Sequence, residues 1–218
     1  MLREYLELWN ALDQKRLDAT FQRWFKLVLQ LINDHRAYSH AVAARYMADM
    51  RRQAGLGPAP VAPLAPLDPG VAEETMRIAT VPVIKKQIGD RKPPQEAMER
   101  GFINSAGRAT KLAMDPGRDT VVETVKRDRD AVGWYRLTDG DPCWFCAMLA
   151  SAGVRYKSEQ SASFEPHDHC GCSAVAVYSK SEQLPESNRQ YADLWRRVTR
   201  GLKGKDAQVA FRRAIEGR

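Results

Sequence analysis

The four cysteines of the chain lie within one stretch of thirty residues, in two tight pairs. Cys143 and Cys146 form the first pair, Cys170 and Cys172 form the second, and His167 stands three residues before the second pair. Thiolate and imidazole are the donors that hold tetrahedral zinc in proteins. The spacing therefore predicts a metal site, and the ion that these donors favour is zinc.

The cluster offers more donors than a tetrahedral ion takes. Two residues separate the first pair, so one turn can present both sulfurs to a single ion. Cys170 and Cys172 are closer together, and both can bind only if the backbone bends sharply at Gly171, which glycine permits. His167 is an alternative fourth donor. We expect His169 to be left out, and the sequence leaves open which four of the five remaining donors bind.

Several interpretations of the cluster compete. A structural zinc site is closed, whereas a catalytic zinc needs a water molecule and a nearby general base, and the number of thiols favours the structural site. Without metal, the thiols would simply pack or form disulfides. A third interpretation is a metal-dependent nuclease of the His-Asn-His type, suggested by His167-Asp168-His169. Cys170 follows at once, which leaves no room for the remainder of such an active site.

Composition places the chain among soluble proteins with one or two domains. It has 218 residues, of which 44% are hydrophobic and 28% charged, as in ordinary globular proteins. No apolar run approaches the roughly 20 residues that cross a bilayer, and the first residues lack the apolar stretch of a signal peptide. We expect a reducing cytoplasm, where clustered cysteines more often bind metal than form disulfides.

Positive charge is in excess, and it concentrates near the C-terminus. The formal net charge is +7. The basic residues that we single out as a nucleic-acid or partner contact are Arg196, Arg197, Arg200, Lys203 and Lys205. A solvated helix face is the simpler interpretation, and phosphate contact is the alternative. A zinc-containing nucleic-acid-binding module is therefore a further possible function.

Helical periodicity dominates the first part of the chain. Residues 1–54 predict a helical hairpin, because apolar and aromatic residues recur at three- and four-residue steps. Residues 55–70 contain five prolines, which favour an extended strap that would let the hairpin dock on a neighbouring subunit. A helix is expected over residues 71–88, with a kink or break at Pro82.

The middle and the end of the chain predict further helices and three short strands. A helix over 95–114 should end at a turn, Asp115-Pro116-Gly117, and residues 119–130 favour a strand that enters a short helix. Short strands are then expected at 133–138, 154–157 and 174–178, around the cysteines. Two closing helices are expected at 186–201 and 206–216.

These elements predict an α+β protein that is predominantly α-helical. Its expected parts are a helical hairpin, a Pro-rich strap, a helical region, a small zinc-knuckle β module and basic C-terminal helices. The expected boundaries are 1–54, 55–70, 71–130, 131–180 and 181–218.

The region around the cysteines resembles a known family. Gly133-Trp134-Tyr135-Arg136, the run from Asp141 to Leu149, and the run from His167 to Cys172 are similar to the C-terminal module of phage-Mu-type head-morphogenesis proteins. The branch found in phages of actinobacteria is the most similar. The resemblance covers residues 71–178, and the strap and both ends of the chain lie outside it.

This resemblance implies a minor capsid protein of a tailed phage, present in few copies at the portal vertex or on the inner capsid wall. Such proteins act in head assembly, DNA packaging or DNA delivery, without established catalysis. The implied partners are the portal protein, the major capsid protein or both, with no membrane. Packaged DNA is the further partner that the basic C-terminal helices could contact. The implied location is the virion, reached from the host cytoplasm during assembly.

Overall fold

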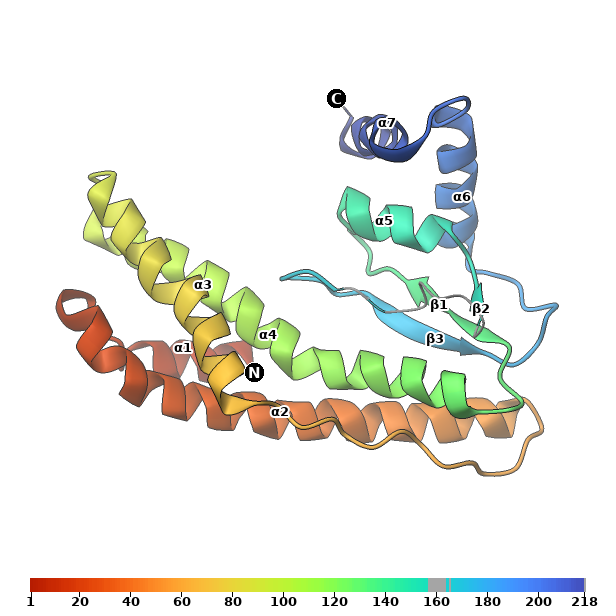
Figure 1. Ribbon diagram of the computed structural model, residues 1–218, viewed down its shortest axis with the longest axis horizontal. Helices are drawn as coiled ribbons and strands as arrows, with labels where there is room; N and C mark the ends of the chain where they lie inside the picture. The colour runs from red at the N-terminus through yellow and green to blue at the C-terminus, as the bar shows by residue number, and fades with distance from the viewer. Residues whose placement is uncertain (157–163, 165, 218) are drawn as a thin grey trace. The chain divides into compact units, whose positions relative to one another are not determined.

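The protein is described by a computed structural model, which covers the chain apart from residues 157–163, 165 and 218 (Figure 1). The described part contains seven α-helices, a short 3-10 helix and three strands. The α+β class with a large excess of helix is therefore confirmed. The helices are α1 (Leu2–Trp9), α2 (Leu17–Gln53), α3 (Pro69–Gly89), α4 (Pro94–Arg127), α5 (Trp144–Ser151), α6 (Glu186–Val198) and α7 (Gly204–Glu216), with η1 at Gln14–Arg16. The strands are β1 (Gly133–Leu137), β2 (Arg155–Tyr156) and β3 (Ser173–Val177). Of the predicted strand 154–157, residue 157 lies outside the described part. Among the described helices, none has an apolar stretch long enough to span a bilayer.

The chain divides into two compact units, and each of them draws on several segments. The first contains residues 1–42, 63–117 and 167–169, and the second contains residues 43–62, 118–166 and 170–218. Helices α2 and α4 therefore each contribute to both units.

An aromatic core holds the first unit together. Tyr5 and Trp24 are fully buried, and their rings meet edge to face with centroids 6.0 Å apart. Phe102 of α4 lies against Tyr5 at 5.7 Å, and Met76 of α3 belongs to the same cluster. The N-terminal hairpin is thus packed on helices of its own chain, which corrects the expectation that it docks elsewhere instead. Contact with a neighbouring subunit stays a prediction.

Helix α3 begins where the sequence predicts. The Asp68 side chain accepts hydrogen bonds from the backbone N–H groups of Gly70 and Val71, as an N-cap residue does. The helix continues through Pro82 as one element, so the expected break is absent there.

Helix α4 corrects two predictions. The turn expected at 115–117 and the strand expected over 119–130 are both part of one 34-residue helix. Val121, Val122 and Val125 recur at helical as well as strand-like spacing, and all three side chains are buried in the core of the second unit. Burial on one helix face outweighs the β preference of valine.

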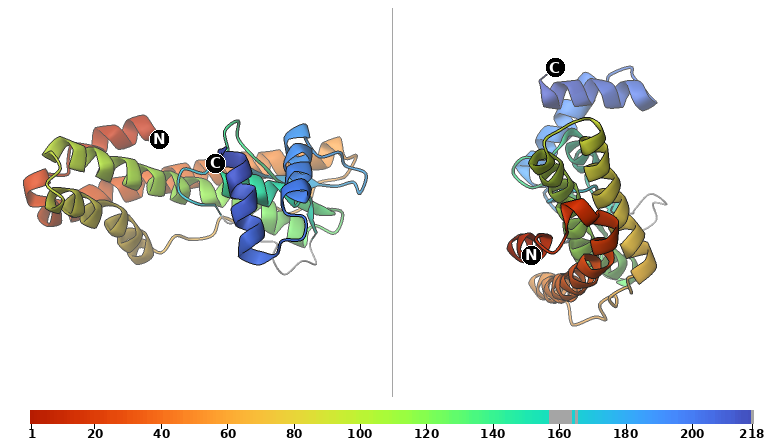
Figure 2. Two further views of the ribbon diagram at one scale, coloured as in Figure 1. Left: turned by 90° about the horizontal axis from the view of Figure 1, so that it is seen from above. Right: turned by 90° about the vertical axis from the view of Figure 1, so that its left-hand side faces the viewer.

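In the second unit, a three-stranded antiparallel sheet has the order β2-β1-β3. Trp134 pairs with Ala176 of β3 and with Arg155 of β2, so β1 is the central strand. The ends of α2 and α4 cover one face of the sheet, and α5, α6 and α7 gather over the other (Figures 1 and 2). Helix α5 is absent from the sequence-based expectations, whereas α6 and α7 confirm the two closing helices.

The Pro-rich strap has no regular secondary structure up to residue 68, where α3 follows, but hydrogen bonds anchor it within each unit. In the second unit, the N–H of Ala62 donates to the Thr124 hydroxyl at 2.9 Å. In the first unit, Arg36 donates to the carbonyl oxygen of Ala65 at 2.7 Å. The strap is therefore a packed segment of the fold.

Candidate metal centre

Three thiols converge in the interior of the second unit. Cys146 lies in the first turn of α5, and Cys170 and Cys172 lie in the segment that leads into β3. The Sγ atoms of Cys146 and Cys170 are 3.5 Å apart, and the three sulfurs all lie within 4.8 Å of one another. The three residues are 2%, 7% and 1% exposed, so water has little access to the cluster.

Local structure explains how the sequence brings these thiols together. Cys143 is the N-cap residue of α5, which places Cys146 one helical turn further on, pointing into the core. Gly171 lies between the other two cysteines, where an added Cβ would be 2.1 Å from Oδ2 of Asp139. Glycine thus allows the segment to pass close to the turn that precedes Cys143.

The geometry fits a tetrahedral zinc site. Zinc–thiolate bonds of about 2.3 Å in a tetrahedron place neighbouring sulfurs about 3.8 Å apart. The observed 3.5 Å between the sulfurs of Cys146 and Cys170 is close to that edge length. The five predicted ligands form two overlapping groups that could each hold a metal ion. One contains Cys143, Cys146 and His167, and the other contains Cys146, Cys170 and Cys172. His169 belongs to neither group.

Two candidates remain for the fourth ligand. Cys143 is exposed and lies at the start of α5, three residues from a buried thiol. His167 belongs to a segment that groups with the first unit, and two residues of chain separate it from Cys170. Its Nδ1 lies 2.6 Å from the carbonyl oxygen of Asp168. Because a carbonyl oxygen only accepts, Nδ1 of His167 carries the proton and donates it. Nε2 then has the free lone pair, which is the arrangement of a histidine that binds zinc.

Two buried arginines surround the thiols. Nε of Arg118 donates to the carbonyl oxygen of Cys172 at 3.0 Å, and Nη2 donates to the carbonyl oxygen of Cys170. Nη1 of Arg136 lies 3.9 Å from the sulfur of Cys170. Both guanidinium groups also lie over the Phe164 ring, with Cζ of Arg136 3.8 Å from its centroid.

This environment favours one thiolate, at Cys170, and keeps the other two cysteines as thiol donors. Hydrogen bonds from the thiols of Cys146 and Cys172 hold the pKa of the Cys170 thiol well below its usual range. The hydrogen bond to Cys170 raises the pKa of Cys146, because that thiol is the donor. A zinc ion bound by three or four thiolates keeps a net negative charge, which two buried guanidinium groups would offset.

Sequence reasoning missed both arginines and Asn188. The Asn188 side chain is fully buried and donates to the carbonyl oxygens of Arg136 and Ala150, at 2.9 and 3.1 Å. It therefore ties α6 to β1 and α5. No local signal identifies these residues, because isolated arginines and asparagines are usually exposed.

The chain matches the family model of the VG15 proteins over residues 1–198. It belongs to the VG15 protein family. VG15 is a viral family, which confirms the phage origin expected from the resemblance, at this coarser level. Comparison with curated proteins and with solved structures finds no match.

The VG15 match contains all five predicted metal ligands and ends at the last residue of α6. The predicted contact residues therefore fall on both sides of its end. Arg196 and Arg197 lie on α6, Arg200 and Lys203 lie between α6 and α7, and Lys205 lies in the first turn of α7. All five are exposed.

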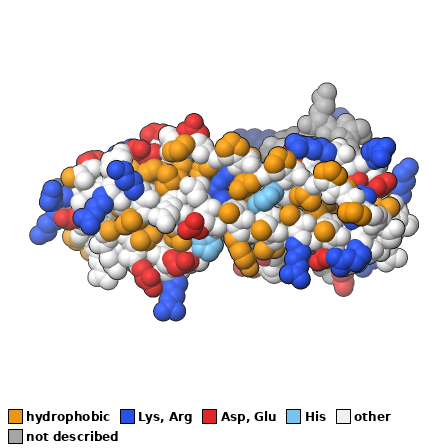
Figure 3. All heavy atoms as spheres, turned by 90° about the horizontal axis from the view of Figure 1, so that it is seen from below, with side chains coloured by type: hydrophobic (Ala, Val, Ile, Leu, Met, Phe, Trp, Pro, Cys, Tyr) orange, Lys and Arg blue, Asp and Glu red, His pale blue; other side chains and the backbone are white. Residues whose placement is uncertain are grey.

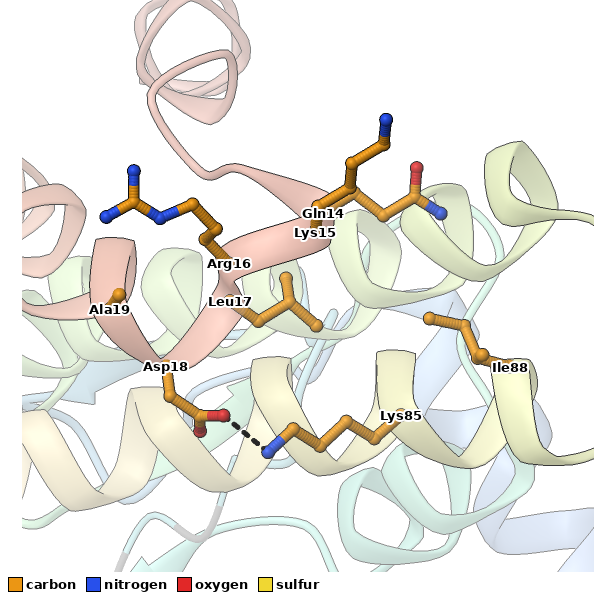
Figure 4. Close-up of a pocket in the computed structure, with 8 residues that line it drawn as sticks. All are labelled: Gln14, Lys15, Arg16, Leu17, Asp18, Ala19, Lys85 and Ile88. Carbon is orange, nitrogen blue, oxygen red and sulfur yellow. Dashed lines mark hydrogen bonds and ion pairs between the residues drawn. The ribbon is translucent and has the colours of Figure 1, made fainter.

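A separate hollow of about 360 Å³ lies in the first unit of this VG15 protein (Figure 4). It is lined by Gln14, Lys15, Arg16, Leu17, Asp18, Ala19, Lys85 and Ile88. Nζ of Lys85 lies 2.6 Å from Oδ2 of Asp18, so an ion pair spans it. Since each of these charges is already matched by the other, we assign no ligand to the hollow.

Proposed function

We propose that the protein is a structural component of the phage head, in which zinc braces a small module of the second unit. Membership of a viral family supports the phage setting. The convergence of Cys146, Cys170 and Cys172 in a buried cluster is the observation that carries the structural role. A closed thiolate site adds stability to a small β unit, and a phage head must withstand packaged DNA.

The proposed ion has a structural role, so we propose no catalysis. Buried thiolates fill coordination positions that a catalytic zinc would leave to water. Cys143 or His167 would complete the four ligands. When bound, the zinc would supply a cross-link between α5 and the segment before β3, and the residues around it would hold that segment in place.

The proposed partners are the portal protein, the major capsid protein, or both, with several copies present in each virion. The two packed units offer separate surfaces for such contacts. The basic residues of α6 and α7 are proposed to face either packaged DNA or an acidic partner surface.

Mass spectrometry of purified phage particles tests the head role. We expect the protein in mature virions and in tail-less heads, and portal rings should capture it from lysates of infected cells. Deletion of its gene should reduce the yield of filled heads. Absence from both kinds of particle, together with a normal yield of filled heads, would overturn the proposal.

Nicking of plasmid DNA distinguishes the nuclease alternative. Purified wild-type protein, His167→Ala and His169→Ala are incubated with supercoiled plasmid and Mg²⁺ or Zn²⁺. We expect no nicking above the buffer control with any of them. Nicking by wild-type protein that both variants lose would replace the structural proposal with catalysis.

A further inference from the structure

A cationic face covers α6 and the turn that leads to α7. Residues 186–217 contain eight basic and four acidic residues, for a net charge of +4. On α6, exposed positions repeat at helical spacing and place four residues on one face. These are Arg189, Asp193, Arg196 and Arg197. The turn adds Arg200 and Lys203, and the first turn of α7 adds Lys205. We call these seven residues the α6–α7 basic face.

Most cations of this face are not neutralised within the chain. Arg196 pairs with Asp193 one turn earlier on the helix. Within the part of the chain that the structure describes, no carboxylate pairs with Arg197, Arg200 or Lys203. Like charges held close together repel one another, and a bound polyanion relieves that repulsion.

A packed scaffold supports the face from below. The Phe211 ring of α7 is fully buried and lies 5.2 Å from the Trp195 ring of α6. Asn188 anchors the start of α6 to neighbouring backbone carbonyls. Gly201 has a φ of +78°, in the left-handed region, which lets the chain turn sharply between the helices. The backbone that carries the cations is therefore already ordered before any partner binds.

The surface favours nucleic acid over protein as its partner. Protein interfaces bury a central apolar patch, whereas DNA interfaces are more polar and far more positive. Around the α6–α7 turn and on α7, two large hydrophobic residues have substantial exposure, Leu202 at 43% and Val209 at 38%. Apolar side chains with greater exposure occur elsewhere, for example Tyr38 and Val42 of α2. Figure 3 shows one face of the molecule, on which hydrophobic side chains are interspersed with charged ones. Nothing on that face indicates what would cover it.

We propose that the α6–α7 basic face binds the phosphate backbone of double-stranded DNA without reading its sequence. Arg189 and Arg197 are eight residues apart on one helix, which corresponds to about 12 Å. Duplex DNA carries about seven phosphate charges along that length. This inference is independent of the zinc site and of attachment to the portal, so portal capture can fail without affecting it.

Fluorescence anisotropy with a short duplex of random sequence tests the proposal. The test variant is Arg197→Gln, Arg200→Gln, Lys203→Gln, and the control removes three exposed charges from the first unit, as Arg16→Gln, Arg23→Gln, Lys26→Gln. Three lost phosphate contacts should lower the slope of log K against log salt by about 2.7. Between about 50 and 200 mM salt, wild-type affinity should then fall about 40-fold more than that of the test variant.

Three further measurements make the result decisive. Circular dichroism checks that each variant is folded, and the lysine version of the test sites, Arg197→Lys and Arg200→Lys, should keep near-wild-type affinity because a point charge suffices. The proposal is overturned if wild-type protein does not bind the duplex, or if the first-unit control weakens binding as much as the test variant. It is also overturned if polyglutamate competes as well as DNA, since the face would then recognise an acidic polypeptide.

Discussion

Arg36 of α2 donates through Nη1 to the carbonyl oxygen of Leu112 on α4, at 3.1 Å. That carbonyl lies four residues before Pro116, which has no N–H to offer it. The arginine therefore replaces the helical hydrogen bond that proline removes. Nearby, the Ser39 hydroxyl accepts from the N–H of Gly117 at 3.1 Å. Side chains of α2 thus compensate for the residues that would otherwise end α4.

Replacing Arg36 should destabilise the first unit. Arg36→Met leaves the carbonyls of Leu112 and Ala65 without this buried donor, and we expect a loss of about 2–4 kcal/mol. In a Pro116→Ala background the restored N–H can bond to Leu112, so the same change should be smaller by about 1 kcal/mol. Urea unfolding of the four proteins measures this coupling. Equal losses in both backgrounds would show that Arg36 does not compensate for Pro116.

Removal of metal should unfold the module around the thiols. A strong zinc chelator should lower the Tm by about 10 °C or more, because loss of a structural zinc removes several kcal/mol. Cys146→Ala should contain less zinc by elemental analysis and show no further response to chelator. A wild-type protein that carries no metal, and whose Tm ignores chelator, would contradict the zinc site.

Arg118 should matter through its two hydrogen bonds as well as its charge. Lysine at this position keeps the charge but cannot donate to the carbonyls of Cys170 and Cys172 in the same fork. We expect Arg118→Lys to weaken zinc binding by about 10-fold or more, measured by competition with a chelating dye. Arg127→Lys, at the exposed end of the same helix, is the control and should bind zinc like wild type.

The acid stability of the second unit should depend on Asp128. Its carboxylate is buried, which by itself raises the pKa, but hydrogen bonds led by Arg51 outweigh this and lower the pKa below its ordinary value. A depressed carboxyl pKa stabilises the folded protein above the unfolded pKa of about 3.9, and this contribution is lost as pH falls through the folded pKa. Asp128→Asn should cost about 3–5 kcal/mol at pH 7 and lose less of its stability on acidification. Urea unfolding midpoints of both proteins between pH 3 and pH 7 measure this difference. An equal fall in the two midpoints on acidification would contradict the prediction.

A methyl group at Gly133 should disrupt the sheet. An added Cβ there would lie 2.3 Å from the carbonyl oxygen of Arg155, which belongs to the backbone of β2 and cannot move aside easily. We expect Gly133→Ala to destabilise the protein by about 2 kcal/mol or more. Gly140→Ala, where no atom lies within 4 Å of the added group, is the matched control. Thermal unfolding compares the two variants. Similar Tm values would show that the backbone of β2 shifts to accommodate the methyl group at little cost.

Sequence patterns were informative where local chemistry decides the structure. Asp68 and Pro69 predict the start of α3, and the cysteine spacing predicts a cluster whose three buried thiols do converge. Tertiary contacts decided the rest. Pro116 predicts a helix end, because the sequence around it does not show the hydrogen bond that Arg36 donates to Leu112. Arg36 lies 80 residues earlier in the chain. The valines of 119–130 read as a strand because their shared buried face depends on a core that assembles from several segments.

The arginines near the thiols show a second limit of sequence reading. Arg118 and Arg136 are buried, at 5% and 3% exposure, but a charged residue in isolation is expected at the surface. Their burial depends on the anionic cluster and the Phe164 ring, which lie elsewhere in the chain. Helix α5 was missed because its eight residues are too few for a periodic signal.

The separation of 24 positions between Cys146 and Cys170 has a consequence for how the protein matures. An ion that joins these thiols closes a loop, and it can do so only once the ribosome has released the later cysteines. The proposed zinc ion would then bind only after helices α1 to α5 have been synthesised.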